Sequence, residues 1–281
     1  MRPATLHRVD VLISAPDLSD ALASDRPPVV LDVRWKLGGP PGHGEYLRGH
    51  IPGAVYVDLE TELSTHGEPT DGRHPLPTAE ALQASARRWG IDEGDTVVVY
   101  DGEGNLSSAR AWWLLRWAGV ADVRILDGAL PAWIAAGRLL ATDDVSPAPG
   151  SVTLTPGALP TIGADEAGSF GGVLLDARAG ERFRGETEPV DPKAGHIPGA
   201  VSAPTTGNLA ADGRFLEPAA LRARFAAVGA DGGRPVAAYC GSGVTAAHEV
   251  AALAIVGIDA ALYPGSWSQW SNLDLPVATG A

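Results

Sequence analysis

The residue with the clearest chemical potential is Cys240, the single cysteine of the chain. It opens the string CGSGVTA, after the apolar run VAAY and before residues with the composition of a helix, TAAHEVAALAIVG. Free amide N–H groups and the helix dipole at such a loop stabilise a thiolate, and they can lower a cysteine pKa from about 8.5 to roughly 3.5–7.5. Gly241 and Gly243 let the backbone close around the sulfur, and Ser242 and Thr245 add hydroxyl groups. The sequence therefore predicts a nucleophilic thiolate.

The chain repeats its own sequence at a spacing of about half its length. The matching pairs are VVLDVRW (29–35) with VLLDARA (173–179), RGHIPGAV (48–55) with AGHIPGAV (194–201), VVVYDGEGN (97–105) with VAAYCGSGV (236–244), and LDGALPAW (126–133) with LYPGSWSQW (262–270). Such self-similarity indicates a duplicated unit. A segment rich in Pro, Gly and Ser at 142–160 separates the repeats and is typical of a surface linker. We predict two domains, 1–141 and 161–281.

Both repeats alternate short apolar runs with helical patterns. The runs at 29–33, 96–100, 173–175 and 236–239 are mainly apolar, as in strands buried on both faces, and helical patterns occur at 78–90, 108–119, 217–229 and 245–257. This alternation predicts an α/β fold, with a mostly parallel sheet flanked by helices in each domain. Ligands of such sheets bind beyond the carboxyl ends of the strands, which is where Cys240 falls.

The first repeat serves as an internal comparison for the cysteine loop. A lone cysteine is commonly a small buried hydrophobe, but Asp101 stands in its place in the first repeat. Because an unpaired buried carboxylate is costly, we expect this position to be accessible to solvent in both repeats. Only the second repeat then carries a nucleophile.

Other polar residues divide into shared and unshared groups. The shared ones are assigned a structural role: Asp32 and Asp176, Arg34 and Arg178, His50 and His196. Arg182 is unshared, since Gly38 takes its place in the first repeat, and a guanidinium group there could hold an anionic substrate. Arg184 is a weaker candidate, and a solvated surface arginine explains it equally well.

Three other loop chemistries fit less well. GSGVTA matches a dinucleotide fingerprint, but no acidic residue ends the next strand and too little chain follows. A cysteine phosphatase needs an arginine closing the loop, where this chain has Ala246. A thioredoxin-like enzyme usually needs a second, resolving cysteine. A binding or regulatory module with an idle thiol stays open.

The composition excludes some classes of partner and favours one cellular compartment. The net charge of −13 repels nucleic acids, and no stretch approaches the ~18 continuous apolar residues of a membrane span. One cysteine allows no intramolecular disulfide, and the first residues lack the apolar core of a signal peptide, so we expect a cytoplasmic protein. Seven histidines and one cysteine form no ligand-like cluster, so neither a metal nor another cofactor is expected.

Together, the paired LD-x-R strands, both GHIPGA turns and the CGSGVTA loop resemble the two-domain rhodanese-like sulfurtransferases along almost the whole chain. The loop is similar to that of 3-mercaptopyruvate sulfurtransferases, whereas thiosulfate sulfurtransferases typically carry basic residues in it. The resemblance implies two tandem rhodanese-like domains, the first inactive. It also implies a small anionic sulfur donor and, as acceptor, cyanide or a thiol, including that of a thioredoxin-like protein.

The resemblance also implies roles for individual residues. Cys240 becomes the sulfur acceptor, Arg182 the residue that grips the substrate anion, and Trp35 an apolar wall of the pocket. Ser242 becomes linked to a histidine and an acid of the first domain. The residues carried over in addition are His74 for the histidine, Glu60 where the family usually has Asp, and Gly241, Gly243, Val244 and Thr245 for the amide cradle.

One position departs from the mercaptopyruvate pattern. A second substrate arginine is expected nine residues after Arg182, where this chain has Asp191. Lys193 or Arg184 is the expected substitute. The loss of a cation weakens carboxylate recognition, so the sequence leaves open whether mercaptopyruvate or thiosulfate is preferred.

Overall fold

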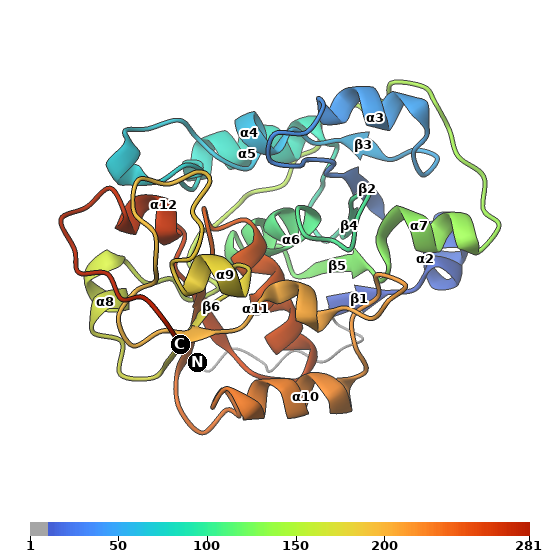
Figure 1. Ribbon diagram of the computed structural model, residues 1–281. Coiled ribbons are helices and arrows are strands. Elements are labelled where there is room, and N and C mark those ends of the chain that lie inside the picture. The colour runs from blue at the N-terminus through green and yellow to red at the C-terminus, as the bar shows by residue number, and fades with distance from the viewer. Residues whose placement is uncertain (1–10) are drawn as a thin grey trace.

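Two parallel sheets organise the protein, one in each half (Figure 1). The computed structural model describes residues 11–281. The first sheet has the strand order β1-β5-β4-β2-β3 and the second the order β7-β6-β8-β9, with all neighbours parallel. The strands are β1 (Leu12–Ile13), β2 (Val29–Asp32), β3 (Val55–Tyr56), β4 (Thr96–Tyr100), β5 (Asp122–Leu126), β6 (Val173–Asp176), β7 (Val201–Ser202), β8 (Val236–Tyr239) and β9 (Ala260–Leu262).

Helices cover both sheets. In the first half these are α2 (Ala15–Leu22), α3 (Gly42–Arg48), α4 (Leu59–Glu62), the 3-10 turn η1 (Pro69–Asp71), α5 (Ala79–Arg88), α6 (Ser108–Trp117) and α7 (Ala129–Ala135). In the second half they are α8 (Ala164–Gly168), α9 (Gly180–Phe183), the 3-10 turn η2 (Thr205–Asn208), α10 (Pro218–Ala227), α11 (Thr245–Ile255) and α12 (Ser266–Trp270). The predicted α/β fold with parallel sheets is confirmed.

The central strands behave as their sequences predict. Val97, Val98 and Val99 of β4 have no exposed surface, because helices pack on both faces of the sheet. Strands β4 and β8 lie at matching places in the two sheets and end immediately before Asp101 and Cys240. The helices that follow, α6 and α11, pack against each other where the halves meet (Figure 1). Both loops therefore approach the contact between the halves.

The residues shared by the repeats have the structural role that the sequence predicts. The guanidinium of Arg34 donates to Asp32 at 2.7 Å and to the Gly49 carbonyl at 2.5 Å. The equivalent contacts in the second half join Arg178 to Asp176 and to the Gly195 carbonyl, both at 2.6 Å. His50 and His196 donate through Nδ1 to the carbonyls of Tyr46 and Phe183. Each brace ties a central strand to the turn beside it.

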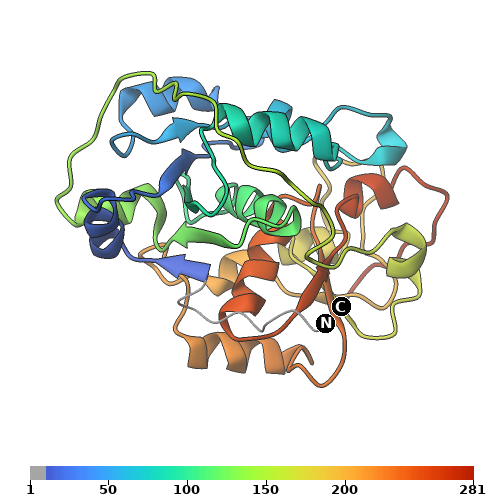
Figure 2. The same cartoon turned by 180° about the vertical axis from the view of Figure 1, so that it is seen from behind.

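The segment predicted as a linker, 142–160, has no helix or strand but is bound to the first half. The Gly150 N–H donates to the Arg87 carbonyl at 2.7 Å, and the Val152 N–H donates to the Ile91 carbonyl at 3.1 Å. The side chains of Val152 and Leu154 are buried. Figure 2 shows this yellow-green segment crossing the molecule beside α5. Within residues 11–281, no helix has the length and apolar character to cross a bilayer.

Two ionisable side chains of α11, His248 and Glu249, are fully buried beside η2. His248 Nδ1 lies 2.8 Å from the Thr205 hydroxyl, and the Asn208 amide donates to Glu249 Oε2 at 2.6 Å. Burial lowers the pKa of His248 to about 3 and raises the pKa of Glu249 to about 7. Both side chains are therefore mainly neutral in the folded protein at mildly acidic pH.

We expect Glu249→Gln to change the pH dependence of stability. Between the ordinary pKa of 4.5 and the folded value of about 7, the folded protein binds this proton more tightly than the unfolded chain does. Glu249 therefore lowers the free energy of unfolding as the pH rises through that window. Glutamine carries no such proton. The free energy of unfolding of the variant minus that of wild type should therefore rise by about 2 kcal/mol from pH 5 to pH 8.

Urea unfolding of both proteins at the two pH values measures this difference. His248 acts in the opposite direction, because its lowered pKa costs stability as the pH falls below 6.5, but it is present in both proteins and cancels. A stability gap between the proteins that is equal at pH 5 and pH 8 would contradict the prediction.

Candidate active site

The loop after β8 holds the thiol of Cys240 against a backbone amide. The Gly243 N–H donates to Cys240 Sγ at 3.1 Å. Gly243 has a φ of +79°, and a Cβ there would lie 2.4 Å from the Pro264 carbonyl oxygen. Only glycine fits both constraints, so the residue type is required by the turn that points this amide at the sulfur.

The backbone of Cys240 is held by the turn at the start of α12. The Cys240 N–H donates to Ser266 Oγ at 3.1 Å, and the Trp267 N–H donates to the Cys240 carbonyl at 2.9 Å. Ser266 itself has a φ of +53°, an uncommon conformation for a residue with a Cβ. In the first half, Ala129 has the same unusual φ, +55°. The repeated turn therefore fixes the residue after the central strand in both halves.

The expectation that this position is open to solvent in both halves is wrong. Cys240 is 1% exposed and Asp101 is 3% exposed. The Asp101 carboxylate is tolerated because its own loop supplies four backbone amides as donors: those of Glu103, Asn105, Ser107 and Ser108. The first-half loop thus offsets the cost of burying the Asp101 carboxylate by donating hydrogen bonds to it.

Residues predicted to act with Cys240 do converge on the loop. Ser242 Oγ lies 2.7 Å from His74 Nδ1, and His74 Nε2 lies 3.3 Å from Glu60 Oε2. His74 is buried, and burial lowers its pKa, against the opposing effect of the Glu60 carboxylate. The Trp35 indole N–H donates to Glu60 Oε1 at 2.7 Å, and its ring stands edge-on to His74. Trp35 thus orients the acid, and its ring lines the cavity next to Asp101, so its role as an apolar wall of the donor pocket stays a prediction.

Arg110 on α6 is a site residue that the sequence analysis missed. Its guanidinium is fully buried and donates to the carbonyls of Leu63, His74 and Gly243. Burial lowers the pKa of Arg110 to about 10, and attraction to Cys240 partly opposes this. The available signal was an arginine inside the otherwise apolar run ARAWWLL (109–115).

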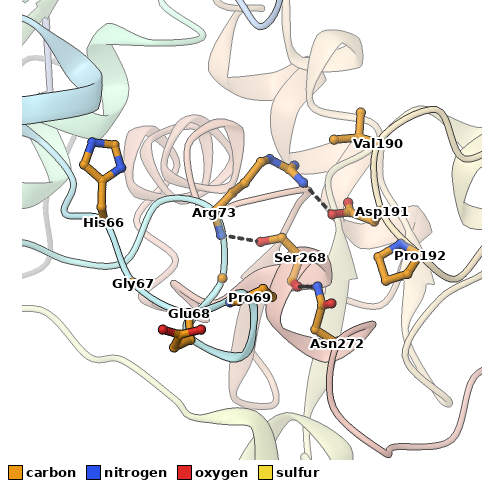
Figure 3. A pocket seen from close by; sticks show the side chains of 11 residues that line it. His66, Gly67, Glu68, Pro69, Arg73, Val190, Asp191, Pro192, Ser268 and Asn272 are labelled. Carbon is orange, nitrogen blue, oxygen red and sulfur yellow. Dashed lines mark hydrogen bonds and ion pairs between the residues drawn. The ribbon is translucent and has the colours of Figure 1, made fainter.

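Two guanidinium groups, one from each half, flank the cysteine loop. A Cβ on Gly241 would lie 3.3 Å from Arg73 Nη2 and 3.5 Å from Arg182 Nη1. Arg73 forms an ion pair with Asp191, and Arg182 donates to Asp191 at 3.3 Å and to Glu188 at 2.6 Å. Arg73 and Asp191 line a cavity of about 540 Å³ beside the loop (Figure 3). Arg73 was not among the residues predicted from the sequence.

Other predicted residues lie elsewhere. The guanidinium of Arg184 is paired with Glu186 at the surface, and Lys193 Nζ donates to the Leu273 carbonyl at 2.7 Å. The residues that line the 540 Å³ cavity include none of Arg182, Arg184 and Lys193, so the expectation that Lys193 or Arg184 replaces the second arginine stays a prediction. Val244 packs in the core. Thr245 lines a separate cavity of about 480 Å³ next to Asp101. Residues 11–281 contain no group of three His, Cys, Asp or Glu side chains placed to hold a metal.

Comparisons with known proteins identify the family of this chain. Residues 14–136 and 163–273 each match the rhodanese-like domain. A Mycobacterium tuberculosis protein provisionally named thiosulfate sulfurtransferase SseB is 53% identical, over 94% of this chain and 95% of its own length. A Pseudomonas aeruginosa protein provisionally named 3-mercaptopyruvate sulfurtransferase is 47% identical, over 98% and 97%. The crystal structure of SseA from Escherichia coli, a protein described among the 3-mercaptopyruvate sulfotransferases, superposes with a TM-score of 0.80 at 32% identity, over 91% of this chain and 98% of SseA. The chain therefore belongs to the rhodanese family, with one rhodanese-like domain in each half.

Proposed function

We propose that this protein is a sulfurtransferase that moves sulfur from a small anionic donor, through a persulfide on Cys240, to a thiophilic acceptor. The observation that carries the proposal is the Cys240 Sγ held by the Gly243 amide, beside the Arg73 and Arg182 guanidinium groups. The names of the relatives support the same reaction class. Sulfur chemistry needs a thiolate that is stabilised as an anion and a cation that positions the donor.

In the first half-reaction, the Cys240 thiolate attacks the outer sulfur of the donor. A Cys240 S–S bond forms as the donor bond breaks, and the bonding electrons leave with the remainder. With 3-mercaptopyruvate the leaving group is the enolate of pyruvate, and with thiosulfate it is sulfite. The Gly243 amide and the helix terminus behind it stabilise negative charge on sulfur throughout.

In the second half-reaction, an acceptor attacks the outer sulfur and regenerates the thiolate. Cyanide would leave as thiocyanate, and a thiol would leave as a persulfide. The chain has no second cysteine that could intercept the Cys240 persulfide as an internal disulfide. A small thiol or the thiol of a thioredoxin-like protein therefore stays a possible acceptor.

The link from Ser242 through His74 to Glu60 supplies a path for one proton. His74 Nε2–H points at Glu60, which leaves Nδ1 to accept from the Ser242 hydroxyl. Since burial lowers the pKa of His74, its ring is neutral and can act as a base near neutral pH. The pair can take the thiol proton of mercaptopyruvate and return it to the enolate carbon.

We expect Ser242→Ala to discriminate between the two donors. Mercaptopyruvate turnover requires this proton transfer and should fall by about 100-fold or more, whereas thiosulfate has no proton to move and should react within about 3-fold of the wild-type rate. Steady-state rates with both donors measure the difference. An equal loss with both donors would instead assign Ser242 to the geometry of the loop.

We expect Arg182→Ala to raise KM for either donor. A hydrogen bond to a charged group contributes about 1.5–3 kcal/mol, which corresponds to roughly 10- to 150-fold. Arg184→Ala provides a matched control, because Arg184 lies two residues away but pairs with Glu186 in solvent. Unchanged donor KM in Arg182→Ala, or an equal rise in both variants, would remove Arg182 from the donor site.

Mass spectrometry after donor treatment tests the proposed function itself. A catalyst should gain one sulfur atom on Cys240 and lose it again on addition of cyanide. A rhodanese-like binding or regulatory module would gain nothing, and that result would overturn the proposal. Because one relative carries a thiosulfate name and another a mercaptopyruvate name, rates with the two donors decide which is preferred.

A further inference from the structure

We infer that Trp35 is a positioning residue, which holds the Glu60 carboxylate against His74 and is itself held by the first-half loop that carries Asp101. The inference rests on the proposed sulfurtransferase function. It goes beyond that function in two ways. It assigns a residue that acts on the proton transfer through Glu60, and it gives the first-half loop, which has no nucleophile, a part in the reaction.

Glu60 needs a second contact if its side chain is to keep one orientation. It projects from α4, a helix of four residues, and its side chain is 43% exposed, whereas the His74 side chain that it faces is 3% exposed. An exposed glutamate samples several rotamers, and fixing one of them costs conformational entropy. The indole N–H of Trp35 donates to Glu60 Oε1 at 2.7 Å, which leaves Oε2 to face His74 Nε2 at 3.3 Å. Each oxygen of the carboxylate therefore has its own partner.

The orientation of Glu60 determines which nitrogen of His74 carries the proton. A neutral imidazole is protonated at the nitrogen that faces an acceptor, so Glu60 keeps the proton on Nε2 and leaves Nδ1 to accept from Ser242. If the carboxylate turned to solvent, the proton could sit on Nδ1, and the ring could no longer accept from the Ser242 hydroxyl. The Trp35 ring also stands edge-on to the imidazole, with 5.2 Å between the centroids.

The backbone of Trp35 is anchored by the loop that follows β4. The Ser107 hydroxyl donates to the Trp35 carbonyl at 2.7 Å, and the Ser107 N–H donates to Asp101 Oδ2 at 2.9 Å. Ser107 is 5% exposed and Asp101 is 3% exposed, so water competes little for these contacts. The Asp101 carboxylate thus fixes the loop, and the loop fixes the residue that carries the indole.

These contacts form one continuous path between the two halves, and its longest distance is 3.3 Å. The path runs from Asp101 through Ser107, Trp35, Glu60 and His74 to Ser242. The second repeat has Ala179 in the place of Trp35 and Ala246 in the place of Ser107, so it could form neither contact. Both residues are confined to the first half, unlike the ion pairs that the repeats share. Such confinement fits a role in a reaction that the protein carries out at one loop.

Trp35→Phe tests the inference, because phenylalanine keeps an aromatic ring and removes the indole N–H. We expect the ratio of kcat for mercaptopyruvate to kcat for thiosulfate to fall about 10-fold, since thiosulfate has no proton to move, with KM for mercaptopyruvate changed less than about 2-fold. Trp133→Phe is the matched control. The Trp133 indole N–H donates to the Leu139 carbonyl at 2.9 Å, and its ring packs in a separate apolar cluster, so the ratio should stay at the wild-type value. An unchanged ratio in Trp35→Phe, or a rise in KM for both donors, would overturn the inference.

The pH profile of mercaptopyruvate turnover is a readout that a merely structural role would not move. Burial lowers the pKa of His74, the Glu60 carboxylate opposes this, and Arg110 and Arg73, which also face the ring, lower the pKa further. If Trp35→Phe releases Glu60, the opposing effect is lost, so the acidic limb of the profile should move to lower pH. Arg110 and Arg73 are unchanged in this variant. An acidic limb at the wild-type pH would show that Glu60 stays on His74 without the indole, and the inference would be wrong.

Two further variants test the ends of the path. Ser107→Ala removes the hydroxyl that anchors Trp35 and should lower the donor ratio about 3-fold, whereas Ser108→Ala, the matched control, removes a hydroxyl that donates to Asn105 within the loop and should leave the ratio unchanged. Equal effects of the two alanines would remove the loop from the path. Trp35→Phe should have no further effect in a Glu60→Gln background, because Trp35 acts through that carboxylate. A further fall of about 10-fold there would contradict the role of Trp35.

Failure of the inference is distinguishable from failure of the proposed function. Wild type that gains no sulfur on Cys240 by mass spectrometry would refute the function. Wild type that gains sulfur, with one donor ratio shared by wild type, Trp35→Phe and Ser107→Ala, would refute the inference alone. Wild type that turns over thiosulfate but not mercaptopyruvate would also refute the inference, because the path would then have no proton to move.

Discussion

Cys240→Ser is expected to abolish sulfur transfer and to leave the fold intact. A serine hydroxyl is not ionised near neutral pH and cannot form a persulfide, so turnover with either donor should fall by at least about 1000-fold. The substitution replaces sulfur by a smaller oxygen at a position that is 1% exposed. The Gly243 N–H that now donates to Sγ can donate to the hydroxyl instead. Donor turnover and mass spectrometry of the treated variant measure the effect.

Circular dichroism and the midpoint of thermal unfolding provide the control for folding. Because the chain has no other cysteine, no second thiol can take over in the variant. Sulfur transfer by Cys240→Ser at the wild-type rate would exclude a covalent intermediate on this residue. Such a result would also remove the basis for the proton transfer that we assign to Ser242 and His74.

Much of the fold could be predicted because the signals are local. The sequence has mainly apolar runs at the strands Val29–Asp32, Thr96–Tyr100, Val173–Asp176 and Val236–Tyr239, the pattern of parallel strands covered on both faces. Because the chain is duplicated, each of these elements could be predicted twice, once from each repeat. It also separated residues found in both halves from residues confined to one half, and the ion pairs of Arg34 and Arg178 agree with a structural role for the shared residues.

Residues whose role depends on how the two halves pack could not be found in this way. Arg73 and Arg110 belong to the first half but contact the loop of the second, and nothing near them in the chain encodes that contact. Lys193 was considered on sequence distance alone, and it bonds a backbone carbonyl instead. The exposure expected for Asp101 was wrong because its own loop supplies the donors that make a buried carboxylate tolerable.

The two loops illustrate one physical device used for two purposes. In the first half, four backbone amides close on the Asp101 carboxylate, so the anion they bind is part of the chain. In the second half, the side chain is a thiol, and the Gly243 amide is directed at sulfur. Backbone donors at a helix terminus favour negative charge in both cases. The residue after the central strand differs between the halves. Asp101 fills the first loop with its own carboxylate, whereas Cys240 gives the second loop a nucleophile.

Arg110→Met is expected to have the second largest effect, on both stability and rate. The guanidinium of Arg110 donates to carbonyls of Leu63 and His74 in the first half and of Gly243 in the second. Methionine would leave three carbonyls buried without their donor, at about 1–3 kcal/mol each, so the free energy of unfolding should fall by at least about 3 kcal/mol. Urea unfolding measures this loss. Arg116→Met, on the same helix but nearer the surface, is the matched control and should cost under about 1 kcal/mol.

The same substitution should slow persulfide formation, because Arg110 is a positive charge buried near Cys240. Attraction between the two is visible in the pKa of Arg110, where Cys240 opposes the decrease caused by burial. Without this charge, negative charge that develops on sulfur during the reaction is less stabilised, so the single-turnover rate at neutral pH should fall. Arg110→Lys keeps the charge and should retain more of the rate, which separates the electrostatic effect from the loss of hydrogen bonds. A single-turnover rate in Arg110→Met equal to that of wild type would show that the guanidinium only joins the two halves and leaves the reactivity of the thiol unchanged.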